Sequence, residues 1–194
     1  MIIAAAMILV AAHFFERPVA QSLVPVFSSA LERVGTQFKI LEIGLHRDGR
    51  SNDVIRLRAN LAHPIAVTNG TAQPFEGWYE ISITLGSVFS YGLLCLILAI
   101  AWPFVGAKQL FFRLIIALPL TALLLVGNVC LTFLAELWNL IRQDFDPGAP
   151  SLLLRWSRFA MGGGGFAAAI VLSAIAILAT TNDANVPVTY HAAK

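Results

Sequence analysis

Residues 159–182 read FAMGGGGFAAAIVLSAIAILATTN and contain no charged side chain. A helix needs roughly 20 such residues to cross about 30 Å of hydrocarbon. The uncharged apolar stretches at residues 81–107 and 114–135 also reach this length, and a shorter one occupies residues 1–15. The sequence therefore predicts an α-helical integral membrane protein with about four transmembrane helices.

The composition agrees with a membrane location. Of the 194 residues, 58% are hydrophobic and 12% are charged, whereas soluble domains contain about 25% charged residues. The formal net charge is +2, and the basic residues form no run or patch of the kind that binds nucleic acid. This length leaves room for one membrane domain and one small appendage.

The N-terminal apolar stretch, residues 1–15, is expected to form an uncleaved anchor helix. No Lys or Arg precedes it and no small-residue cleavage site follows it, so it differs from a signal peptide. Apolar residues continue at helical spacing beyond it, with a break expected at Pro18, a kink at Pro25 and a stop at Gly35. Residues 1–35 are therefore predicted to be an anchor with an amphipathic continuation.

The period of the apolar residues then changes from helical spacing to alternation. Residues 37–46 and 54–61 alternate between apolar and polar side chains, which is typical of half-buried strands. The dipeptide Asp48-Gly49 between them predicts a β-hairpin. The two halves of the first strand are out of phase, and a bulge near Ile40 would reconcile them.

Further short strands are expected at residues 66–68 and 78–83. Residues 36–80 are thus predicted to form a small β-rich extramembrane domain between the first and second spans. Residues 81–182 are predicted to be a three-helix membrane domain, and residues 183–194 a flexible tail.

The basic residues of short loops predict the orientation in the membrane. The connector after the second span carries Lys108 and Arg113 and no acidic residue, so we expect it in the cytoplasm. Residues 16–80 would then be periplasmic in a multi-pass protein of a bacterial inner membrane. Arginines near the opposite span ends, including Arg142 and Arg158, outnumber these two, which leaves the reverse orientation open.

A polar stripe crosses the third predicted span. Asn128, Thr132 and Glu136 are spaced by four residues and share one face of a helix. The first interpretation is hydrogen bonding between helices of the bundle. One alternative is a binding groove for a peptide or a lipid. Another is a proton or ion path, in which Glu136, at the end of the span, would be the one carboxylate.

Small residues recur every fourth position on two of the spans, which lets helix backbones approach closely. Four consecutive glycines precede the last span, where a non-helical backbone is also possible. These faces are predicted to pack against other helices of the chain or against a partner. The candidate positions are Gly86 and Ser90 on the second span, and Gly162, Gly165, Ala169 and Ser173 on the last.

Both cysteines, Cys95 and Cys130, lie in apolar stretches, so they provide no disulfide framework for the polar region. The simplest interpretation is that they are small buried side chains. A nucleophilic Cys130 would need a nearby base or cation, and His13 is the one histidine in an apolar stretch. No catalytic residue, metal ligand set or cofactor motif is predicted.

The order of segments resembles that of small bacterial membrane proteins encoded beside exosortases, which are multi-spanning cysteine transpeptidases. The residues that carry the resemblance are Ser90-Tyr91-Gly92-Leu93-Leu94, Pro119, residues 127–134 and Trp156-Ser157-Arg158-Phe159. The Asn-Pro expected shortly before Tyr-Gly is replaced by residues 82–89. The resemblance implies a non-enzymatic accessory role and adds Tyr91 and Gly92 to the candidate helix-packing positions.

We therefore expect a non-catalytic accessory subunit of an inner-membrane complex for protein sorting, secretion or envelope assembly. Its partners would be the lipid bilayer and a larger membrane protein. The alternative is a small transporter or lipid-handling protein that uses the face formed by Asn128, Thr132 and Glu136. An intramembrane enzyme based on Cys130 is a third hypothesis.

Overall fold

The computed structural model describes the backbone of residues 2–49, 52–67, 70–72, 76–104, 106–145 and 152–181. Side chains are described from Glu16 onward within these ranges, except at residues 65–67, 70–72, 144 and 145. The predicted tail at residues 183–194 lies outside the described residues.

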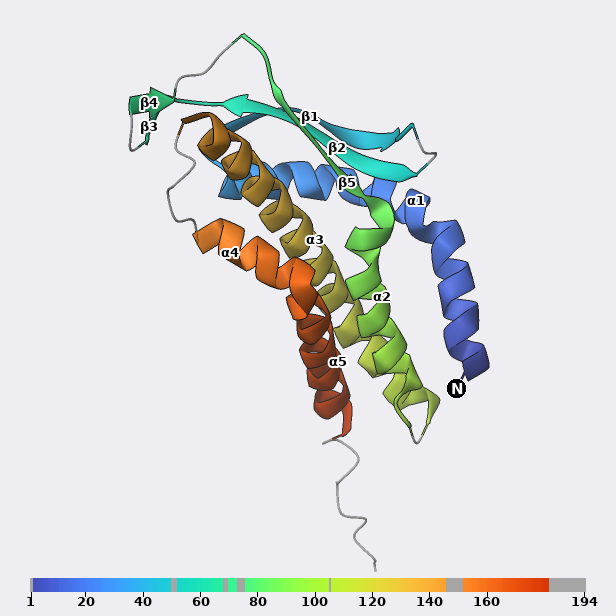
Figure 1. The fold of residues 1–194 in the computed structure, drawn as a ribbon. Helices are drawn as coiled ribbons and strands as arrows, with labels where there is room; N and C mark the ends of the chain where they lie inside the picture. Colours follow the sequence, from blue (N-terminus) through green and yellow to red (C-terminus); the bar gives the residue numbers. More distant parts are fainter. Residues whose placement is uncertain are drawn as a thin grey trace, which may run out of the picture.

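Within these ranges the fold is mostly helical, with a small antiparallel sheet across one end of the helices (Figure 1). The elements in chain order are α1 (Ile2–Val34), β1 (Phe38–Arg47), β2 (Asp53–Leu61), β3 (Ile65–Val67), β4 (Gly70–Ala72), β5 (Tyr79–Thr84), α2 (Leu85–Ala101), α3 (Ala107–Phe145), α4 (Leu152–Phe159), the π-helical turn η1 (Ala160–Gly164) and α5 (Gly165–Thr181).

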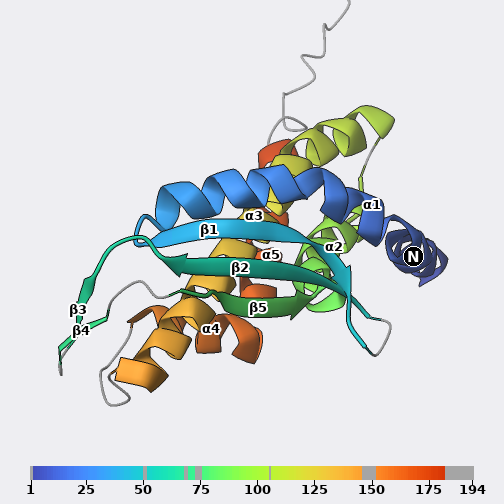
Figure 2. The ribbon, with the colours of Figure 1, turned by 90° about the horizontal axis from the view of Figure 1, so that it is seen from above.

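The first helix, α1, contains Pro18 and Pro25 and yet is assigned as one helix, so the break predicted at Pro18 is wrong. It is bent instead: one segment runs along the direction of the other helices, and the next runs alongside β1 at the edge of the sheet (Figures 1 and 2). Proline removes a helical hydrogen bond and clashes with the preceding turn, which accounts for the bend. Phe27 and Leu31 of the second segment are fully buried.

The predicted hairpin is confirmed. β1 and β2 pair antiparallel, and their register shifts between Ile40 and Glu42, where the bulge was expected. β5 pairs with the other side of β2, which gives the strand order β1-β2-β5, while β3 and β4 form a separate two-stranded ribbon. Ile55, Leu57 and Ala59 of β2 face the helices and are fully buried.

The second predicted span is shorter than expected. Residues 81–84 belong to β5, so α2 begins at Leu85 and ends at Ala101. Its 17 residues correspond to about 26 Å of helix. Pairing with β2 explains the difference. Ile81 pairs with Leu57 of β2 and therefore belongs to the sheet instead of the helix.

Two stretches within the described residues are long and apolar enough to cross a membrane, Ala107–Gln143 and Leu152–Thr181. The predicted four spans are therefore not confirmed, and the side chains of the first lie outside the described part. The 39 residues of α3 give about 58 Å of helix, roughly twice the hydrocarbon thickness. This helix extends the predicted stretch of 114–135 at both ends.

The C-terminal part of α3 packs against the sheet in a continuous apolar core. Phe133 and Leu137 of α3 are fully buried in the same cluster as the residues of α1 and β2 named above. The rings of Phe38 and Trp138 meet edge to face with centroids 6.0 Å apart. Sheet and helices are thus packed as one unit.

The last predicted span is interrupted near its start. α4 runs along the side of α3, and the chain then turns into α5 (Figure 1). Gly163 has φ 118° at this turn, a backbone conformation that only glycine adopts readily. The non-helical backbone that the sequence allowed at the glycine run is confined to Gly163, since Gly165 already has helical angles, and helical structure extends upstream to Leu152.

Candidate functional site

The polar stripe on α3 is not gathered into one cavity. Asn128, Thr132 and Glu136 are all half-buried. Asn128 lines a groove of about 500 Å³ between α3, α4 and α5, whereas Thr132 and Glu136 do not line it. The structure thus gives Asn128 a place beside an apolar groove and leaves the other two residues outside it.

Among the small residues, Gly165 and Gly92 make close helix contacts. A Cβ on Gly165 would lie 2.8 Å from the ring of Tyr91, and a Cβ on Gly92 would lie 3.0 Å from Leu125. Tyr91 also stacks edge to face on Phe166 with centroids 4.7 Å apart, and its hydroxyl lies 3.4 Å from the carbonyl oxygen of Ala160. These glycines therefore bring α5 onto α2, and α2 onto α3.

The other small-residue candidates divide into two groups. Ala169 and Ser173 are buried on the face of α5 that packs inside the chain. Gly86 and Gly162 lie in open surroundings, where an added Cβ would meet no atom closer than 3.9 Å. Ser90 is half-buried and donates to the carbonyl oxygen of Ser87.

Both cysteines are free and buried, Cys95 completely and Cys130 at 5% exposure. Cys130 belongs to the apolar core cluster that includes Val129 and Phe133. Among the described residues, no group of three His, Cys, Asp or Glu side chains is placed to hold a metal ion.

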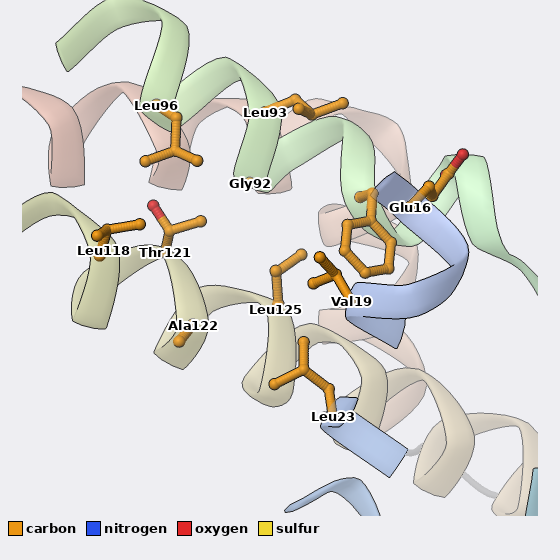
Figure 3. Close-up of a pocket in the computed structure, with 11 residues that line it drawn as sticks. Glu16, Val19, Leu23, Gly92, Leu93, Leu96, Leu118, Thr121, Ala122 and Leu125 are labelled. Atoms are coloured by element: carbon orange, nitrogen blue, oxygen red, sulfur yellow. The ribbon is translucent and has the colours of Figure 1, made fainter. Parts of the chain in front are cut away.

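A cleft of about 320 Å³ lies between α1, α2 and α3 (Figure 3). Its walls are apolar and include Leu23 of α1, Leu96 of α2 and Leu118 of α3. Two polar residues also line the cleft, Glu16 of α1 and Thr121 of α3, and the hydroxyl oxygen of Thr121 is buried with no hydrogen-bond partner among the described residues. This cleft suits an apolar group that carries a hydrogen-bond acceptor.

The outward face of the sheet carries a network of ion pairs. Arg58 donates from Nε to Glu80 at 2.8 Å and from Nη1 to Glu42 at 3.0 Å. Its guanidinium also lies over the ring of Trp78, 5.3 Å from the centroid. The hydrogen bond from Arg58 is the main cause that lowers the pKa of the Glu80 carboxyl, and the charge of Arg56 lowers it further.

Trp78 comes shortly before the apolar stretch of residues 81–107, but in the structure it directly precedes β5 and its ring packs against Arg58 of the sheet. Trp102 follows the last residue of the apolar helix α2 and is 55% exposed. This position fits an interfacial anchor.

A buried arginine was missed by the sequence analysis. Arg113, expected in a connector, lies in the first part of α3 and is 0% exposed. It donates hydrogen bonds to carbonyl oxygens of Ala99, Trp102 and Pro103 at the end of α2, and to Thr180 of α5. Its place as the seventh residue of a long apolar helix was the feature that could have indicated a buried position.

The chain matches no protein-family model, no curated protein and no solved structure.

Proposed function

We propose that the chain is an integral membrane protein that acts as a non-catalytic accessory subunit of a bacterial inner-membrane complex for protein sorting, secretion or envelope assembly. The observation that carries this proposal is the continuous core between the sheet and α3. Because Phe38 packs on Trp138 and Leu57 is fully buried in the same core, the sheet is held in a fixed position at one end of the helices. A docking subunit needs such a rigid platform.

The edge of β5 is the proposed contact for the partner. Among the described residues β5 pairs with β2 on one side only, so the other side offers backbone donors and acceptors to an added strand. Ser82 and Thr84 are exposed along this strand, and Trp78 precedes it at 54% exposure. An exposed tryptophan beside an open strand edge is a common energetic anchor in protein interfaces.

The test is photo-crosslinking in native membranes followed by mass spectrometry. A photoreactive residue at Ser82 is expected to give a discrete protein adduct, and one at Arg33, exposed at the end of α1, is expected to give none. Trp78→Ala should reduce the Ser82 adduct several-fold. Absence of any protein adduct from Ser82, or equal adducts from both positions, would remove the basis of the proposal.

The second candidate function is lipid handling. It is favoured by the Thr121 hydroxyl in the cleft of Figure 3, which has no hydrogen-bond partner among the described residues, and by the groove beside Asn128. Lipid adducts from Ser82, with no protein adduct, would favour this candidate over the accessory role.

A further inference from the structure

The helix α4 presents two kinds of exposed side chain on neighbouring faces. Leu152, Trp156 and Phe159 share one face and are 84%, 51% and 56% exposed. Arg155 and Arg158 are exposed beside them, and neither forms an ion pair with a carboxylate whose side chain the structure describes. Such a helix is typical of the boundary between lipid headgroups and acyl chains.

The apolar face of α4 borders a long groove. Trp156 and Phe159 line two hollows, of about 500 Å³ and about 680 Å³, which also share Leu131 of α3. The first hollow continues to Val171 of α5, and the second is lined by Arg155. The positively charged side chain of Arg155 therefore lies at one end of an apolar groove.

The floor of the groove has room for a ligand. Gly127 lines it, and a Cβ added there would meet no atom within 4 Å. Leu124 and Leu131 on either side supply hydrocarbon contacts, and Asn128 supplies an amide. The groove also lies along Ala107–Gln143 and Leu152–Thr181, the two stretches long and apolar enough to cross a membrane.

We propose that this groove binds an anionic phospholipid, with its phosphate at Arg155 and Arg158 and one acyl chain along α3 and α5. Arginine matches phosphate geometry through paired N–H donors. Arg155 in the groove lining and Arg158 beside it on α4 supply the positive charge, and neither pairs with a carboxylate whose side chain the structure describes. The hydrocarbon walls accept the chain, and Trp156 covers it at the headgroup level. This site is independent of the docking edge on β5.

The test is native mass spectrometry of the full chain, purified in detergent and incubated with phosphatidylglycerol or phosphatidylcholine. The wild type should retain more phosphatidylglycerol. Each basic side chain near an anionic headgroup is expected to contribute about fivefold in affinity, so the pair Arg155→Gln and Arg158→Gln should lower retention about 25-fold, to the phosphatidylcholine level. The pair Arg155→Lys and Arg158→Lys should keep the preference for phosphatidylglycerol through its charge, with weaker retention than the wild type because lysine lacks the paired N–H donors.

A matched pair of variants tests the groove itself. Ala167 and Ala174 are both exposed on α5, and Ala167 lines the groove whereas Ala174 does not. Ala167→Trp should therefore reduce retention of both lipids, and Ala174→Trp should leave it unchanged. Thermal unfolding of each variant separates loss of binding from loss of fold.

Equal retention of the two lipids by the wild type would overturn the proposal. So would undiminished phosphatidylglycerol binding by the folded double glutamine variant, or equal effects of Ala167→Trp and Ala174→Trp. A protein that occupies the groove and excludes both lipids would overturn it as well.

Discussion

Arg113 donates a hydrogen bond from Nε to Oγ1 of Thr180, at 3.3 Å, which joins the start of α3 to the last turn of α5. Its remaining nitrogens donate to carbonyl oxygens at the end of α2. Carbonyl groups at a helix C-terminus lack partners within the helix and carry partial negative charge. One buried cation thus ties together the ends of three helices.

Arg113→Met should destabilise the protein strongly, because it leaves the buried carbonyl group of Ala99 and the partly buried carbonyl groups of Trp102 and Pro103 without this donor. We expect a loss of about 2–4 kcal/mol, measured by thermal unfolding in detergent with circular dichroism. Lys108→Met is the matched control, since Lys108 is exposed on the same helix and should change little. If both variants unfold at the same temperature, Arg113 does not stabilise the helix ends.

Gly165→Ala should loosen the contact between α5 and α2. The added methyl group would lie 2.8 Å from the ring of Tyr91, which is buried at 8% exposure, so the ring must move. Overpacking of this kind costs about 1–3 kcal/mol. Gly127→Ala, in open space on α3, should be neutral or slightly stabilising, and a comparable loss there would point to a general effect of alanine on these helices.

Gly163→Ala should destabilise the turn between α4 and α5. Gly163 has φ 118°, and an alanine held in a sparsely populated conformation costs about 1–3 kcal/mol. The neighbouring Gly162 has no positive φ and no atom within 4 Å of its Cβ position. Gly162→Ala should therefore match the wild type in thermal unfolding, and an equal loss for both would show that the kink does not depend on this backbone angle.

Gly35→Ala should disturb the turn that places the sheet on α3. Its Cβ would lie 2.7 Å from Leu134 and 2.9 Å from the carbonyl oxygen of Leu31, and the backbone cannot yield cheaply. We expect a loss of about 1–3 kcal/mol in the free energy of unfolding. Gly49→Ala in the hairpin turn is the control. A Cβ on Gly49 would meet no atom within 4 Å, so this variant should leave the free energy of unfolding unchanged.

The sheet was predictable because its signals are local. Alternation along β2 and the Asp-Gly turn fix the hairpin, and the phase change in β1 fixes the bulge at Ile40. The start of α2 was not predictable in this way, because an apolar run such as Ile81 to Ile83 suits a strand or a helix equally well. Residues 81–84 form a strand because they pair with β2 in the folded chain.

The buried position of Arg113 was not predictable for a different reason. Arg113 directly precedes the uncharged stretch of residues 114–135, so it was assigned to the connector before that stretch. Its acceptors, Ala99, Trp102, Pro103 and Thr180, come from segments that meet only in the folded chain. The stripe from Asn128 to Glu136 shows the converse, since shared helical spacing did not place all its members in one groove.

Glu80→Gln should alter the acid sensitivity of the sheet. Because Arg58 lowers the pKa of Glu80 below its ordinary value of 4.5, the ionised carboxylate stabilises the folded state above that pH, and the stabilisation is lost as the pH falls through the lowered pKa. The wild type should exceed Glu80→Gln in unfolding temperature at pH 7, and the difference should shrink below about pH 4.5.

Glu76→Gln is the control for this titration. Glu76 is exposed just before β5 and forms no ion pair with the described residues, so its removal should leave the wild-type profile unchanged between pH 7 and the acid range. A gap between the wild type and Glu80→Gln that stays constant with pH would mean that Glu80 acts through packing. In that case the ion pair with Arg58 would not be the source of its contribution.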